Sequence, residues 1–98
     1  MSSPFAGLSY SYEEKTEIRI EEKMSEMVEK YKYKGIVGSR GMSDILEGKR
    51  RIEERKSKYE WIGNLYSGVN IYLYLKEGRY YIMNVRYGEV EAFNEIFI

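Results

Sequence analysis

The residues of this chain that could carry chemistry are carboxylates, lysines, tyrosines and serines, because it contains neither histidine nor cysteine. The lack of histidine removes the commonest general base and metal ligand, and the lack of cysteine removes disulfides, thiolate metal ligands and thiol nucleophiles. Adjacent residues on a helix do not face the same point, so paired glutamates there are best explained as solvated surface charge. We therefore expect no enzymatic activity, no catalytic residue, no metal site and no cofactor. The paired glutamates are Glu13-Glu14, Glu21-Glu22 and Glu53-Glu54.

A basic cluster at residues 49–58 is one candidate binding site. Arg51, Arg55 and Lys58 would share one face of a helix, and such a patch could hold phosphates with an affinity that falls as salt is added. The alternative is a solvated helix face whose glutamates neutralise part of the field. A second basic run, residues 30–34, is explained by favourable cations at a helix C-terminus. The residues proposed for nucleic-acid contact are Arg40, Lys49, Arg50, Arg51, Arg55 and Lys58.

A glycine loop, Gly38-Ser39-Arg40-Gly41, lies between two predicted helices and follows the apolar pair Ile36-Val37. This Gly-x-x-Gly segment resembles the loop of KH domains, which clamps the backbone of a single-stranded nucleic acid. The resemblance implies that residues 38–41 contact phosphates and that Arg40 supplies positive charge. The alternative is an ordinary connection between helices.

Two helices are predicted to precede a run of strands. Apolar residues at helical spacing predict the first helix over residues 21–33, and residues 10–20 are either a strand, which is slightly favoured, or its first turns. A thinner apolar stripe predicts a second helix over 44–56. The first stripe is Ile20, Met24, Met27, Val28 and Tyr31, and the second is Ile45, Leu46 and Ile52.

The last 41 residues alternate with period two and are interrupted by short turns, which predicts strands over 58–66, 69–76, 79–87 and 90–97. Such short loops force neighbouring strands to be antiparallel. The expected fold is α+β: two N-terminal helices packed on a four-stranded antiparallel meander, in one domain covering 1–98 with a flexible lead at 1–9. The expected cross-strand pairs are Leu75 with Tyr80, Leu73 with Ile82, Tyr74 with Tyr81, and Arg86 with Glu91.

Both faces of this meander are apolar, and seven of the 11 tyrosines lie after residue 57. Two short helices are expected to cover one face, the aliphatic one, so a second copy of the chain is expected on the other. The alternative is that residues 10–33 wrap round and cover the aromatic face within one chain. The predicted aliphatic face is Ile62, Val69, Ile71, Leu73, Leu75, Ile82, Phe93 and Phe97. The predicted aromatic face is Tyr59, Trp61, Tyr72, Tyr74, Tyr81, Met83, Val85, Tyr87 and Ile96, and its proposed dimer contacts are Trp61, Tyr72, Tyr74, Tyr81 and Tyr87.

The charge composition excludes a generally basic nucleic-acid coat protein, because 16 Lys and Arg balance 16 Asp and Glu. Glutamate supplies 15 of those acids and glutamine is absent, a composition typical of thermostable proteins. No apolar run approaches the length of a membrane span and no signal peptide is evident, so we expect an intracellular protein that does not bind membranes.

The composition and the segments Glu13-Glu14-Lys15, Tyr31-Lys32-Tyr33-Lys34 and Tyr72-Leu73-Tyr74 resemble, in style, small orphan proteins encoded by viruses of thermophilic archaea. The resemblance implies a thermostable viral dimer that acts in the host cytoplasm on a host or viral protein. The predicted function is therefore a small non-enzymatic homodimeric interaction protein. The alternative is a nucleic-acid-binding protein that uses the glycine loop 38–41 and the basic helix 49–58.

Overall fold

A computed structural model describes residues 19–38, 40–66 and 68–98. Residues 19–30 are helical and are named the N-terminal helix here, so residues 19 and 20, where a strand over 10–20 was slightly favoured, are helical instead. The rest of that segment and the lead at 1–9 that was predicted to be flexible lie outside the described residues. Four antiparallel strands follow α2 in the order β1-β2-β3-β4, which confirms the predicted α+β meander. The elements are α2 (Met42–Arg55), β1 (Tyr59–Tyr66), β2 (Val69–Lys76), β3 (Arg79–Arg86) and β4 (Glu89–Ile96).

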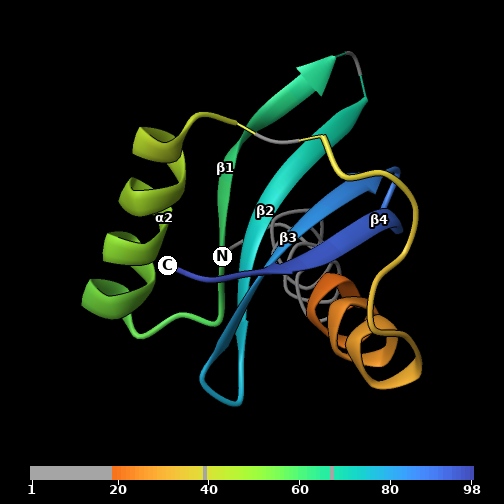
Figure 1. Cartoon of the computed structure of the whole chain (residues 1–98), viewed down its shortest axis with the longest axis horizontal. Helices are drawn as coiled ribbons and strands as arrows, with labels where there is room; N and C mark the ends of the chain where they lie inside the picture. The colour runs from red at the N-terminus through yellow and green to blue at the C-terminus, as the bar shows by residue number, and fades with distance from the viewer. Residues whose placement is uncertain (1–18, 39, 67) are drawn as a thin grey trace, which may run out of the picture.

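The two helices pack on opposite faces of the sheet, so the expectation that both cover the aliphatic face is wrong (Figure 1). Ile45 and Ile52 of α2 contact the aliphatic face, whereas Met24 of the N-terminal helix contacts the aromatic face. The chain therefore covers its aromatic face itself, as the alternative interpretation expected. The residues of that face which pack with Met24 are named the tyrosine face and are Tyr74, Tyr81, Met83, Val85, Val90 and Phe93.

Helical periodicity explains how the N-terminal helix buries this face. Ile20, Met27 and Val28 pack around Met24, which is fully buried, and these are the predicted stripe residues. The helical residues end at residue 30, so the last residue of the predicted stripe, Tyr31, lies beyond them and is exposed.

Ion pairs and hydrogen bonds at both ends of the sheet also hold the N-terminal helix. Lys76 at the end of β2 donates to Ser25 and forms an ion pair of 2.8 Å with Glu29. The hydrogen bond from Lys76 lowers the pKa of the Glu29 carboxyl, and the same bond raises the pKa of Lys76. Lys23 forms an ion pair with Glu89 at the start of β4.

The expected register holds between β2 and β3 but not between β3 and β4. Leu75 lies opposite Tyr80, Leu73 opposite Ile82 and Tyr74 opposite Tyr81, as predicted. The last turn, however, is formed by residues 87–88, both with positive φ (48° and 77°), rather than by 88–89.

A one-residue shift in the β3–β4 pairing reverses the faces assigned to β4. Met83 lies opposite Phe93, beyond an irregularity in the β3–β4 pairing, which places Phe93 on the tyrosine face. Ile96 correspondingly packs on the aliphatic side, so both predicted assignments are wrong. Arg86 is opposite Glu89 rather than Glu91, yet its side chain still forms an ion pair of 2.9 Å with Glu91.

α2 approaches β1 closely because Gly48 has no side chain. Gly48 is buried, and a Cβ atom at this position would lie 2.5 Å from the Ile62 side chain. Glycine normally weakens a helix by about 1 kcal/mol relative to alanine, but here it makes the close helix–sheet contact possible.

None of the described helices is long and apolar enough to cross a membrane.

Candidate functional site

The five residues proposed as dimer contacts do not form one exposed surface. Tyr74 and Tyr81 are buried beneath the N-terminal helix, and Tyr72 is partly buried against the same cluster. Trp61 on β1 is half exposed, with its ring nitrogen donating to Asn70 at 3.0 Å, and Tyr87 is exposed in the β3–β4 turn. The N-terminal helix of the same chain therefore covers the centre of the tyrosine face, where a second copy was expected.

Three of the six residues proposed for nucleic-acid contact line one groove of about 510 Å³ between α2 and β1. Each already has a partner in the chain. Arg40 pairs with Asp44 at 3.2 Å and Arg55 with Glu60 at 3.4 Å. Arg51 donates to the main-chain oxygen of Trp61 at 2.9 Å. We name this surface the arginine groove; carboxylates line it as well and neutralise much of its charge.

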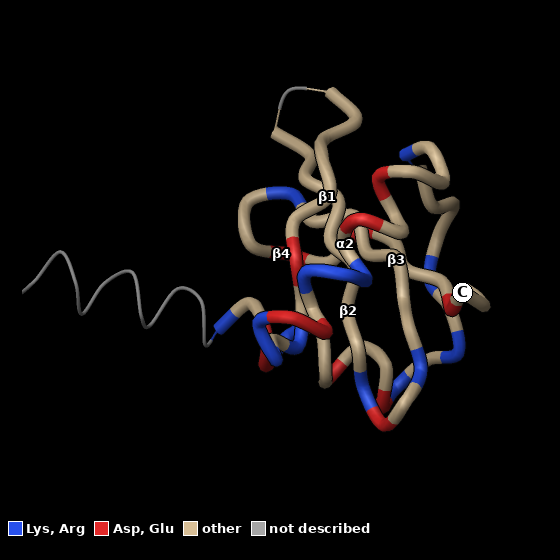
Figure 2. Tube along the Cα trace, turned by 90° about the vertical axis from the view of Figure 1, so that its left-hand side faces the viewer, with Lys and Arg blue, Asp and Glu red and all other residues tan. Residues whose placement is uncertain are grey.

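The other three proposed residues lie elsewhere. Lys49 lies over the ring of Tyr80, Arg50 pairs with glutamates of its own helix, and Lys58 pairs with Glu21 of the N-terminal helix at 3.5 Å. Figure 2 shows Lys and Arg interspersed with Asp and Glu along the trace, rather than gathered on one element. The basic cluster of the sequence is therefore not one patch in the structure.

The glycine loop is fixed to the sheet through Asn84 of β3. The Gly38 amide donates to Asn84 Oδ1 at 2.7 Å, and Asn84 Nδ2 donates to the Gly38 oxygen at 2.9 Å. Asn84 is only 3% exposed and Gly38 is partly buried, and the two residues exchange a pair of hydrogen bonds as two main-chain amides do. The main-chain groups of Gly38 are thus engaged, and the flanking helices lie on opposite faces of the sheet. Neither feature provides the phosphate clamp that the resemblance to a KH loop implies.

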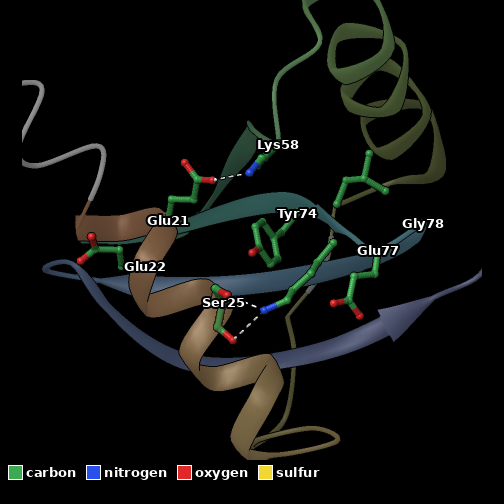
Figure 3. A pocket seen from close by; sticks show the side chains of 9 residues that line it. Glu21, Glu22, Ser25, Lys58, Tyr74, Glu77 and Gly78 are labelled. Carbon is green, nitrogen blue, oxygen red and sulfur yellow. Dashed lines mark hydrogen bonds and ion pairs between the residues drawn. The ribbon is translucent and has the colours of Figure 1, made fainter.

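A pocket of about 690 Å³ lies between the N-terminal helix and the β2–β3 hairpin. Figure 3 shows Glu21 and Lys58 facing one another at this pocket. Ser25 accepts hydrogen bonds from Lys76 through its side-chain and main-chain oxygens. Tyr74 and Leu75 also line it. Because these lysines pair with groups of the N-terminal helix, the pocket is explained by helix docking.

A second pocket, of about 440 Å³, lies where the N-terminal helix ends over β3 and β4. Three aromatic side chains that line it are strongly exposed: Tyr31 at 52%, Tyr33 at 67% and Phe97 at 90%. Lys32 and Arg79 line it too, and neither has an ion-pair partner among the described residues. We name this site the aromatic pocket. Its other lining residues are Val28, Tyr81, Asn94 and Glu95.

The aromatic pocket was missed by the sequence analysis, although one signal was present. Lysine and tyrosine alternate over residues 30–34, a pattern that we attributed to the charge preference of a helix C-terminus. The structure adds Arg79 from β3 and Phe97 from the end of the chain. These two residues are distant in sequence from residues 30–34, so only the fold brings them together.

No group of three or more metal-binding side chains is found among the described residues. Comparisons with protein-family models, with curated proteins and with solved structures find no match to this chain. Its function is therefore inferred from the geometry of its own surfaces.

Proposed function

We propose that this protein is a small non-enzymatic interaction protein whose contact surface is the aromatic pocket. One observation carries the proposal: three strongly exposed aromatic rings and two cations line the same pocket. Neither cation has an ion-pair partner among the described residues. A soluble protein gains nothing from exposing large aromatic side chains together, so such patches typically mark interaction sites. Tyrosine, phenylalanine and arginine are also enriched in the cores of protein interfaces.

Selection from a library of displayed random peptides tests this proposal, because it samples partners of many sequences at once. We expect peptides enriched on the immobilised wild-type protein to lose binding to a Tyr33→Ser/Phe97→Ser variant. Both side chains are exposed, so the variant should melt at the wild-type temperature. Arg51→Ser/Arg55→Ser is the control, because it changes the arginine groove alone. No enrichment, or enriched peptides that bind the Tyr33/Phe97 variant equally well, would contradict the proposal.

The homodimer stays a prediction, but its original reason no longer applies. The N-terminal helix covers the centre of the tyrosine face, so pairing of subunits requires another surface. The aromatic pocket is the surface that we propose for such a contact.

A nucleic-acid role for the arginine groove is the second candidate function, supported by the three arginines that line it together.

A further inference from the structure

We propose that the aromatic pocket binds single-stranded nucleic acid, with bases stacked on its exposed rings and phosphates held by Lys32 and Arg79. This inference goes beyond the proposed function, because it gives the same pocket a ligand that is not a protein. Exposed aromatic rings and cations in one pocket are the two features that single-strand-binding surfaces combine.

The aromatic residues provide the stacking surface. Tyr31 and Tyr33 follow the N-terminal helix, and Phe97 lies just beyond the end of β4, so the rings come from opposite ends of the described chain. Their exposure leaves ring surface available to a planar ligand. Every base has a π-face, so stacking of this kind tolerates sequence variation.

The two cations provide the charge that a phosphate backbone requires. Lys32 and Arg79 are both exposed and, among the described residues, neither is in an ion pair. A phosphate can therefore bind them without displacing a carboxylate. Glu95 is the one acidic residue that lines the pocket among those the structure describes. In the arginine groove, by contrast, phosphates would compete with Asp44 and Glu60 for arginines that already have partners.

The form of the pocket favours a single strand over a duplex. Bases in a duplex are stacked on one another and cannot lie on protein rings, whereas the bases of a single strand can be splayed apart. A volume of about 440 Å³ lies within the range of pockets that hold small ligands, so it suits one or two nucleotides.

The test is fluorescence anisotropy with labelled single-stranded and duplex oligonucleotides of mixed sequence, at salt concentrations from about 50 to 200 mM. We expect the wild-type protein to prefer the single strand. Tyr33→Ser/Phe97→Ser should weaken its binding by about tenfold or more, the effect of losing one stacked base. Lys32→Ser/Arg79→Ser should lower the slope of log affinity against log salt by roughly 1.4, since each phosphate contact to a single strand contributes about 0.7.

Arg51→Ser/Arg55→Ser removes two positive charges from the arginine groove and so separates the two candidate surfaces. This inference expects the affinity and the salt slope of that variant to equal those of the wild type. Absence of binding at the lowest salt would overturn this inference, as would equal affinity for duplex. Binding lost in the Arg51/Arg55 variant and kept in the Tyr33/Phe97 variant would overturn this inference and assign nucleic acid to the arginine groove. If displayed peptides bind the aromatic pocket and oligonucleotides do not, the proposed function stands and this inference fails.

Discussion

Replacing Met24 with glutamate is expected to detach the N-terminal helix from the sheet or to unfold the protein. Met24 is fully buried between the helix and the tyrosine face. Removal of a buried methionine side chain costs about 2–5 kcal/mol, and an unpaired buried charge adds several more. That sum is comparable to the whole stability of a small domain, about 5–15 kcal/mol. Chemical denaturation measures the loss, and a dye that binds exposed apolar surface reports the uncovered tyrosine face.

The control for Met24→Glu is Glu22→Gln, an exposed position on the same helix. A surface change of this kind usually alters the free energy of unfolding by less than about 0.5 kcal/mol. If Met24→Glu were as stable as this control, the helix would not be packed on the tyrosine face.

Replacing Asn84 with alanine is expected to produce the second large loss of stability. The side chain of Asn84 satisfies both the amide and the carbonyl of Gly38, at a position that is almost fully buried. A fully buried main-chain group left without a partner costs about 1–3 kcal/mol, and Gly38 is partly buried, so the loss for each of its two groups is expected at the lower end of that range. Hydrogen exchange at the Gly38 amide should rise in the variant, and denaturation should show the loss. An unchanged exchange rate would show that Asn84 does not hold the loop.

Asn84→Asp gives a pH-dependent version of the same experiment. The introduced carboxylate can accept from the Gly38 amide but opposes the Gly38 oxygen, and burial raises the pKa of the carboxyl above its usual value of about 3.9. Its protonated form can donate to that oxygen. The stability lost relative to wild type is therefore complete above the raised pKa and shrinks as the pH falls through it towards 3.9. A deficit that does not change with pH would contradict this arrangement.

The sequence predicts the strands well because local signals determine them. Glu77-Gly78 is a two-residue turn with positive φ at both positions, which matches the twist of the strands and sets the β2–β3 register. The helical stripe through Met24 likewise follows from residue spacing alone. In both cases the residues that decide the structure are close in sequence.

The face assignments of β4 and the placement of the helices depend on longer-range effects. Tyr87 adopts a positive φ that is uncommon for a residue other than glycine, so the sequence favours a turn at 88–89 over the observed one at 87–88. This change of turn moves the partner of Arg86 by two residues, from Glu91 to Glu89, and by itself leaves the faces unchanged. The irregularity between Asn84 and Val85 then shifts the pairing by one residue, and a one-residue shift reverses the faces of the side chains beyond it. Nothing local indicates that residues 31–41 carry the chain from one face of the sheet to the other.

The candidate site could be predicted only in part, for the same reason. Tyr31 and Tyr33 follow from the end of the first helix, but their partners Arg79 and Phe97 depend on how that helix crosses the sheet. Arg50, Arg51 and Arg55 of the basic cluster lie on one helix, as predicted. The ion pair of Arg55 with Glu60 and the hydrogen bond from Arg51 to the main-chain oxygen of Trp61 depend on how that helix packs on β1.

Cross-linking tests most directly whether the N-terminal helix covers the tyrosine face of its own chain, the arrangement on which the aromatic pocket depends. Lys23 and Glu89 form an ion pair across this contact, and the chain has no native cysteine. We predict that Lys23→Cys/Glu89→Cys treated with a short bismaleimide gives a cross-linked product of one chain, at low and high protein concentration. Lys23→Cys/Glu54→Cys should give no such product, because its second cysteine lies on α2, which packs on the opposite face of the sheet. A product of two chains from the first variant, or none, would contradict the account.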